Sequence, residues 1–353
     1  MDIVSLYQKD QPFVCISAPM VRYSKLPFRL LVRRHGVDLA YSPMIMSAAF
    51  LHSEKSRSSD FTTCPSDRPM IAQIACQSGP EFARCAEELA KVCDGIDLNC
   101  GCPQRWAMKE GYGAAMLKKP ELIEDLVKSA RSAVPRWRIV KNEDGEETRA
   151  PFSVSIKIRL VPCPPRATGG DTVSAASLTG TNNVELTTEL VQRAAHMGVD
   201  WVTIHGRTPS QRTTSPASWS DVGEVIAARI SHTTETSAPL PIFLNGDVKT
   251  LDDAAEAHRI SGCQGVMVAR GLLQDPALFK KDGPKSPWSF YQEWLELCEE
   301  YPESMPFSSI HRQAYWIMEK HLEKKDRKIL QKIEGIDNLK AFQLNARADF
   351  KCI

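Results

Sequence analysis

The sequence has little of what marks secreted, fibrous or membrane-spanning proteins. Its 353 residues include 11 cysteines, which are too sparse for a disulfide-stapled scaffold of this size. It contains no apolar run of about 18 residues, the length needed to cross a bilayer, and its N-terminus lacks the basic-then-apolar pattern of a signal peptide. These absences predict a soluble, intracellular protein, cytoplasmic or nuclear, with reduced thiols and no membrane contact.

The sequence also lacks an excess of charge of either sign, with 44 Lys and Arg against 43 Asp and Glu. A balance near zero argues against a protein that attracts nucleic acid through a field over its whole surface. The charge is nevertheless distributed unevenly along the sequence. Residues 22–35 contain five basic and no acidic residues, and residues 320–332 contain six basic and two acidic residues. Each basic segment is either a phosphate-binding surface or an ordinary solvated helix face.

A dinucleotide-binding fingerprint is also missing. No G-x-G-x-x-G follows an early strand-like segment, and GYGAAM at 111–116 lacks the third glycine. A separate dinucleotide-binding domain is therefore not expected. If a nicotinamide serves as reductant, it must visit another cofactor transiently.

What the sequence does have is a regular alternation of short apolar segments and helix-like segments. Runs rich in β-branched residues, typical of buried parallel strands, occupy 12–20, 37–43, 69–75, 95–101, 152–160, 199–206, 241–247 and 265–271. Helical periodicity fills most of the intervals. This alternation predicts an α/β protein with a closed (β/α)8 TIM barrel. A doubly wound open sheet is the alternative that the pattern alone leaves open.

Two segments interrupt this pattern, and a third ends it. Residues 138–150 are charged and poor in apolar residues, and residues 161–183 are rich in Pro, Gly, Ser and Thr, so both are predicted to be surface insertions. Strand-like segments stop near residue 284, and only helix-like runs follow. We therefore expect a barrel domain over 1–283 and a C-terminal all-helical domain over 284–353.

The carboxyl ends of the strand-like segments share a polar character. In a (β/α)8 barrel these ends carry the reactive residues. Seven of the eight segments end in a polar or glycine-containing cluster, which predicts a functional ring around the barrel mouth. The ring comprises Pro19–Met20, Gln73, Asn99 with Cys102, Lys157 with Arg159, His205 with Arg207, Asn245–Gly246–Asp247 and Ala269–Arg270–Gly271.

The last two clusters of this ring fall where such barrels commonly bind a phosphate. Gly246 and Gly271 let backbone N–H groups approach an anion, and Arg270 adds charge. Two ordinary glycine turns are the alternative, but their occurrence on consecutive strands favours a binding site. With Lys157 and His205 expected to add cations, the ring suits an anionic, planar ligand rich in hydrogen-bonding groups, such as flavin mononucleotide (FMN).

The segment NCGCPQ at 99–104 contains two cysteines. No C-x-x-C or His pair completes Cys100-x-Cys102 as a zinc site, so no metal is predicted. Cys100 ends a strand and is expected to be buried. Cys102 follows in a loop bounded by Gly and Pro, where an exposed thiol can donate a proton. A structural cysteine is the alternative for Cys102, and its place in the ring favours a catalytic thiol.

The order and wording of these motifs resemble the tRNA-dihydrouridine synthase family. The resemblance runs along nearly the whole chain, through APM at 18–20, LNCGCPQ, SIKIR, TIHGRT, NGD and VARG. It is strongest to the eukaryotic branch that acts on D-loop uridines 20a and 20b, through segments 18–29, 99–116 and 205–213. The insertions at 138–150 and 161–183 depart from the family pattern.

The resemblance implies a flavin-dependent reduction of the uracil C5=C6 bond in tRNA. Hydride would pass from reduced FMN to C6, a proton would pass from Cys102 to C5, and NADPH (or NADH) would reduce the flavin again. The partner would be tRNA, with no obligate protein partner. The implied flavin-binding residues are Pro19, Met20, Gln73, Asn99, Lys157, His205, Asn245, Gly246, Asp247, Ala269 and Arg270. The implied tRNA contacts are Arg159, Arg207, Arg212, Lys324, Lys325 and Lys328.

Two other functions are compatible with a flavin barrel. One is an oxidoreductase acting on a free pyrimidine, of the dihydroorotate type, which leaves the basic helical tail without a role. The other is a tRNA-binding protein that has lost turnover. The presence of Cys102, Lys157 and His205 argues against that second alternative.

Overall fold

The computed structural model describes residues 12–141, 146–163, 183–230, 239–281 and 286–350. Within them a parallel barrel closes, because neighbouring strands pair in sequence order and the last pairs with the first. Its strands are β1 (Val14–Ser17), β2 (Leu39–Tyr41), β4 (Met70–Ala75), β5 (Gly95–Cys100), β8 (Ser153–Arg159), β9 (Trp201–His205), β10 (Ile242–Asn245) and β11 (Gly265–Val268). The predicted TIM barrel is confirmed, and the open sheet is excluded. A short β3 (Ile45–Met46) pairs with β4 outside the ring.

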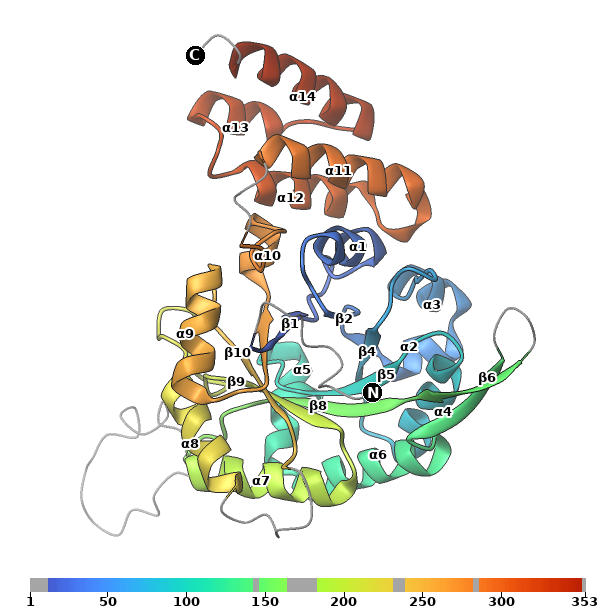
Figure 1. The fold of residues 1–353 in the computed structure, drawn as a ribbon. Helices are drawn as coiled ribbons and strands as arrows, with labels where there is room; N and C mark the ends of the chain where they lie inside the picture. Colours follow the sequence, from blue (N-terminus) through green and yellow to red (C-terminus); the bar gives the residue numbers. More distant parts are fainter. Residues whose placement is uncertain (1–11, 142–145, 164–182, 231–238, 282–285, 351–353) are drawn as a thin grey trace.

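Helices surround the barrel in the intervals where periodicity predicted them (Figure 1). They are α1 (Leu26–Arg34), α4 (Gly79–Ala90), α6 (Pro120–Ala133), α7 (Val184–Met197), α8 (Trp219–Ile230) and α9 (Leu251–Ser261). The sequence marks several of their ends. Asn183 caps α7, Thr250 forms a capping box with Asp253 at α9, and Gly198 and Gly262 end these helices in the left-handed conformation.

The barrel interior is a packed core and not a pore. Trp201 and Phe243 lie inside it with ring centroids 5.6 Å apart, together with Ile16, Tyr41 and Met267. The Trp201 indole N–H donates to the Tyr41 hydroxyl over 2.8 Å, so the polar atoms of these buried rings are paired. This filled interior gives the strand ends a rigid base.

The described residues of the predicted insertion at 138–150 are 138–141 and 146–150, and they lie on the surface, as expected. They belong to an antiparallel pair of strands, β6 (Trp137–Lys141) and β7 (Glu147–Pro151), that extends from the side of the barrel (Figure 1). Trp137 and Ile139 on β6 are largely exposed. The cation of Arg149 lies 5.4 Å from the Trp137 ring, which is a cross-strand contact that periodicity does not reveal. Of the second predicted insertion, residues 164–182 lie outside the described residues.

Shorter helices connect some strands near the barrel mouth. They are α2 (Ser47–His52), α3 (Glu54–Asp60), α5 (Arg105–Lys109), the 3-10 helix η2 (Gly113–Lys118) and α10 (Arg270–Gln274). These helices were not predicted, since segments of five to seven residues carry little periodicity.

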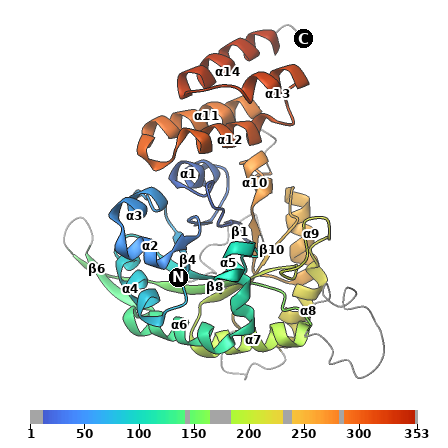
Figure 2. The same ribbon diagram turned by 180° about the vertical axis from the view of Figure 1, so that it is seen from behind.

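The described chain after β11 is helical. α11 (Pro287–Glu300), η3 (Pro302–Ser304), α12 (Phe307–Met318), α13 (Lys324–Leu330) and α14 (Ile336–Phe350) form a layer beyond α1, at the top of Figures 1 and 2. His35 at the end of α1 bonds Glu293 of α11 through Nε2 over 2.7 Å. Gln313 of α12 donates to the Leu273 carbonyl of α10 over 3.0 Å. These bonds join the helical layer to the barrel. None of the described helices has the length and apolar character needed to cross a bilayer.

Candidate active site

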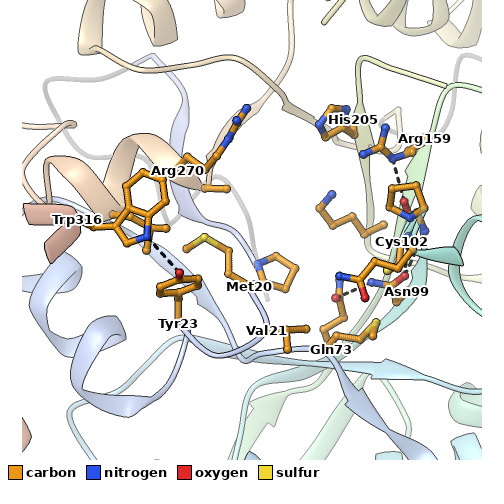
Figure 3. A pocket seen from close by; sticks show the side chains of 18 residues that line it. Met20, Val21, Tyr23, Gln73, Asn99, Cys102, Arg159, His205, Arg270 and Trp316 are labelled. Atoms are coloured by element: carbon orange, nitrogen blue, oxygen red, sulfur yellow. Dashed lines mark hydrogen bonds between the residues drawn. The ribbon is translucent and has the colours of Figure 1, made fainter. Parts of the chain in front are cut away.

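A cavity of about 410 Å³ opens at the carboxyl ends of the strands (Figure 3). It gathers most of the ring that the sequence predicted. Those residues are Pro19, Met20, Gln73, Asn99, Cys102, Lys157, Arg159, His205, Ala269 and Arg270. A smaller cavity of about 120 Å³ adjoins it and adds Arg207 and the Asn245–Gly246–Asp247 turn. The two cavities share His205, Ala269 and Arg270, so they form one continuous site.

The loop that carries Cys102 is tied to the end of β5. The Asn99 side-chain oxygen accepts from the backbone N–H of Cys102 over 3.0 Å and from that of Gly101 over 3.3 Å. On the other side, Ala114 of η2 donates to the Cys102 carbonyl over 3.0 Å. Gly113 has φ +61° there, and a Cβ would lie 2.6 Å from the same carbonyl, so only glycine allows this approach. Cys102 is therefore partly exposed to the cavity on a fixed loop.

Arg159 connects the loops after β5 and β9. Its guanidinium donates to the Gly101 carbonyl over 2.9 Å and to the Thr208 carbonyl over 3.0 Å. Burial, together with the nearby Arg207 cation, lowers its pKa to about 10, so it stays charged at neutral pH. Arg159 was predicted to contact tRNA. In the structure it holds the Cys102 loop and presents only part of its surface to the cavity.

Lys157 places a cation at the centre of the site. Its Nζ donates to the Asn245 side-chain oxygen over 3.0 Å, and the Asn245 amide donates to the Met267 carbonyl over 2.8 Å. Burial is the main reason that the pKa of Lys157 falls to about 8, and the Arg159 cation lowers it further. The amine is therefore mostly protonated at neutral pH but close to its titration.

His205 does not add the cation that we expected. Burial and the surrounding cations Lys157, Arg159 and Arg207 lower its pKa well below the usual value, so the imidazole is neutral at physiological pH. Its buried Nδ1 has no hydrogen-bond partner among the described residues. A buried ring nitrogen of this kind is available to a ligand.

The small cavity has the shape of an anion-binding turn. Gly246 has φ +129°, and a Cβ there would lie 2.8 Å from the Ala217 side chain. Asp247 accepts from the Ala217 N–H over 2.8 Å and pairs with Arg207, while Arg270 is 55% exposed and lies 3.8 Å from the Asp247 carboxylate. The turn thus combines a glycine at positive φ with an exposed cation, Arg270, beside the Asp247 carboxylate.

Arg207 corrects a second expectation. It was predicted to contact tRNA near the mouth, but its side chain is buried. It pairs with Asp247 and donates to the Ser215 carbonyl over 2.6 Å. A guanidinium that is enclosed in this way supports the turn and cannot reach a macromolecule. Arg212, five residues further, is exposed.

The first basic segment, residues 22–35, is mostly internal. Arg29 is buried and donates twice to Asp67, over 2.9 and 2.7 Å, and Arg33 pairs with the other Asp67 oxygen over 3.1 Å. Lys25 donates to the Ser59 carbonyl over 2.6 Å. Neither a phosphate-binding surface nor a solvated face describes these three cations, because they join the start of α1 and α1 itself to residues 59–67. The other two cations of the segment, Arg22 and Arg34, are exposed.

The second basic segment differs. Lys324, Lys325 and Lys328 of α13 are exposed, and among the described residues the one ion pair that involves them joins Lys325 to Glu323 over 3.9 Å. This segment remains available to a polyanion.

An apolar wall of the cavity was not predicted, and Figure 3 shows two of its residues, Tyr23 and Trp316, on the left. It contains Val21 and Tyr23 after β1, Leu273 of α10 and Trp316 of α12. The Trp316 indole N–H donates to the Tyr23 hydroxyl over 3.1 Å. The helical layer therefore supplies part of the site. Neither residue ends a strand, and 293 residues separate them, so no local pattern signals the contact.

The closed parallel barrel, with Cys102, Lys157, His205 and the Asn245–Asp247 turn at its mouth, has the architecture of an α/β-barrel enzyme. The model of the family described as "Dihydrouridine synthase (Dus)" matches residues 16–160 and 173–350. The chain belongs to this family, which confirms the resemblance seen in the sequence.

Curated relatives agree in length as well as in sequence. The human protein named "tRNA-dihydrouridine(20a/20b) synthase [NAD(P)+]-like" is 37% identical over 93% of this chain and 89% of its own. The Schizosaccharomyces pombe "tRNA-dihydrouridine(20a/20b) synthase [NAD(P)+]" is 33% identical over 94% of this chain and 88% of its own. The Saccharomyces cerevisiae protein with that same name is 32% identical over 92% of this chain and 77% of its own.

Proposed function

We propose that this protein reduces D-loop uridines 20a and 20b of tRNA to 5,6-dihydrouridine, with FMN bound at the barrel mouth and NADPH, or alternatively NADH, as reductant. The observation that carries the proposal is a thiol on a fixed loop, Cys102, that lines the same cavity as the buried amine of Lys157 and the imidazole of His205, whose Nδ1 has no partner among the described residues. The names of the relatives support the substrate and the positions.

The residues present fit FMN. The larger cavity offers Gln73, Asn99 and Lys157 to a hydrogen-bonding ring system, and the free Nδ1 of His205 lies where the two cavities meet. The glycine turn with Arg270 suits the phosphate. When bound and reduced, the flavin supplies the hydride that uracil C6 accepts.

This chain's own residues supply the rest of the chemistry. Cys102 holds the proton that C5 takes up, because C5 becomes basic through its conjugation with the C4 carbonyl. Asn99 holds the loop that carries the thiol. The protonated Lys157 places positive charge where negative charge develops during reduction. Arg159 bonds the loops after β5 and β9 and so fixes the distance between these groups.

The target uridine must leave its stack to reach the cavity, which costs a few kcal/mol and requires contacts elsewhere on the tRNA. We place these contacts on the exposed Lys324, Lys325 and Lys328 and on Arg212. Residues 284–353 would then form a tRNA-binding domain beside a catalytic domain of residues 1–283. The reaction would take place in the cytoplasm or the nucleus, where tRNA is present.

The test is a reaction with purified full-length protein. It should carry a flavin absorbance, and with NADPH it should form dihydrouridine at 20a and 20b of an unmodified tRNA transcript, mapped by sequencing. A colourless protein that gains no activity with added FMN would contradict the proposal. Reduction of free uracil with indifference to tRNA would favour the barrel acting on a free pyrimidine.

A further inference from the structure

A buried carboxylate lies beneath the active site and takes no part in the chemistry described so far. Asp97 lies on β5, two residues before Asn99, and its side chain is fully buried inside the barrel. No ion pair joins it to a cation within the part of the chain that the structure describes. Its partners are the Ser155 hydroxyl at 2.6 Å and the Gln73 amide N–H at 2.8 Å. Burying a carboxylate without a paired cation lowers the stability of the fold, which indicates a functional role for Asp97.

The sheet register places these groups in two layers. Gln73, Asp97 and Ser155 are direct neighbours across β4, β5 and β8, and Asn99 and Lys157 are neighbours one layer nearer to the mouth. The side chains are linked between the layers, because the Asn99 amide donates to the Gln73 side-chain oxygen over 2.8 Å. A continuous chain of hydrogen bonds therefore runs from Ser155 and Asp97 through Gln73 and Asn99 to the backbone N–H of Cys102.

The Asp97 carboxylate gives this series of hydrogen bonds a direction. An ionised carboxylate only accepts hydrogen bonds, so Gln73 must turn its NH2 group toward Asp97 and its oxygen toward Asn99. Asn99 must then turn its NH2 group toward Gln73 and its oxygen toward the Cys102 loop. With a neutral group at position 97 both amides are free to reverse, and a reversed Asn99 would present N–H to N–H at Cys102 and release the loop.

We propose that Asp97 is a positioning residue whose carboxylate orients the Gln73 and Asn99 amides and thereby holds the Cys102 thiol at the reacting carbon. The inference rests on the proposed function, since it takes Cys102 as the proton donor. It assigns Asp97 no contact with substrate or cofactor.

The first experiment replaces Asp97 by Asn, which keeps the volume and removes the fixed direction. Reduced enzyme is mixed with saturating tRNA, and flavin reoxidation is followed in a single turnover. A small displacement of the reacting group lowers rates on the order of 10²-fold, and we expect a loss approaching that for Asp97→Asn, with flavin content and tRNA affinity retained. Ser155→Ala is the matched control, because it removes a bond to the same carboxylate but leaves the direction of the amide chain, and it should lose much less.

The second experiment restores the direction with exchanged partners. In the double variant Asp97→Asn with Gln73→Glu, the carboxylate introduced at position 73 accepts from the amide introduced at position 97 and from Asn99. Asn99 therefore again turns its oxygen to Cys102. We expect this double variant to react faster per bound flavin than either single variant, at saturating FMN. If the single variants lost activity only through poorer packing, the two losses of rate would instead add up in the double variant.

A pH profile supplies a readout that a purely structural role would not move. Burial raises the pKa of Asp97 to about 6, while hydrogen bonds from Ser155 and Gln73 and the charge of Lys157 hold it down. The other titratable neighbours, Tyr41 and Cys100, are buried and have raised pKa values, so they stay neutral in this range. The single-turnover rate of the wild type should therefore fall as pH drops below about 6, and that step should vanish in Asp97→Asn.

Equal rates for Asp97→Asn and wild type, or a double variant slower than both single variants, would overturn the inference while dihydrouridine formation by the wild type still stood. A wild type that forms no dihydrouridine would instead refute the proposed function.

Discussion

The two walls of the active-site cavity are built in different ways. The polar wall, with Gln73, Asn99 and Cys102, comes from two adjacent barrel strands and the loop after the second. It is held by hydrogen bonds from the Asn99 amide to the Gln73 side chain and from the Cys102 backbone N–H to the Asn99 side chain. The apolar wall comes from the segment after β1, from α10 and from α12 of the helical layer. One indole–hydroxyl bond joins Trp316 of α12 to Tyr23 after β1. The first wall is part of the barrel sheet, whereas the second is assembled across two parts of the chain.

From this difference we infer that the two walls have different roles, the polar wall in proton transfer and the apolar wall in contact with the tRNA. Groups that exchange protons must keep their positions to a fraction of an ångström, which a barrel sheet provides. A wall that meets a large substrate can instead be carried by the element that grips the rest of it, and α12 with Trp316 directly precedes the lysine-rich α13. Changes in the polar wall should therefore lower kcat, and changes on the helical side should weaken tRNA binding or raise KM for tRNA.

The largest effect is expected at Cys102. Cys102→Ala removes the proton donor, and loss of a positioned general acid lowers rates by about 10²–10⁴-fold. Dihydrouridine formation in a single turnover with reduced enzyme should fall by that factor, while flavin absorbance and tRNA affinity are kept. Cys64→Ala is the matched control, since Cys64 is partly exposed but lies outside the cavity. An unchanged rate for Cys102→Ala would remove the acid role from this thiol.

The polar wall could be predicted from the sequence for a physical reason. In a parallel barrel every strand ends at the same rim, so Gln73, Asn99, Lys157 and His205 could be grouped from strand ends alone. What could not be foreseen is how the groups act on one another. The neutral state of His205 follows from burial beside four cations, which no local motif encodes.

The apolar wall and the role of the first basic segment could not be predicted from the sequence, because both depend on contacts between residues that are far apart in the chain. Trp316 lies in an ordinary amphipathic helix, and its contact with Tyr23 depends on how that helix sits over the barrel mouth. Arg29 pairs with the buried Asp67, which lies 38 residues away in the sequence. Long-range pairs of this kind leave no periodic signal.

A smaller effect is expected from the lysines of α13. Charge reversal of Lys324, Lys325 and Lys328 to Glu should weaken tRNA binding about tenfold and flatten the slope of log affinity against log salt by about 2, because three phosphate contacts are lost. Turnover at saturating tRNA should stay the same. Fluorescence titrations over a range of salt concentrations measure both quantities.

The control carries the same change in net charge elsewhere on the surface. Lys91, Lys128 and Arg259 are exposed, and each pairs with a neighbouring glutamate of its own helix or helix end. Reversing these three should leave the salt slope unaltered. If both triple variants showed the same slope as the wild type, α13 would not belong to the tRNA-binding surface.

The smallest effect concerns the bond that joins the two parts of the apolar wall. Trp316→Phe keeps an aromatic ring but removes the donor to Tyr23, a loss of about 1 kcal/mol for one hydrogen bond, or about fivefold. We expect this fivefold change in KM for tRNA with kcat preserved, and the same change for Tyr23→Phe. The double variant should add nothing further, because both single variants break one bond. Trp137→Phe on the distant β6 hairpin should change neither constant. A fall in kcat at unchanged KM for Trp316→Phe would place this tryptophan with the catalytic wall and end the division between the two walls.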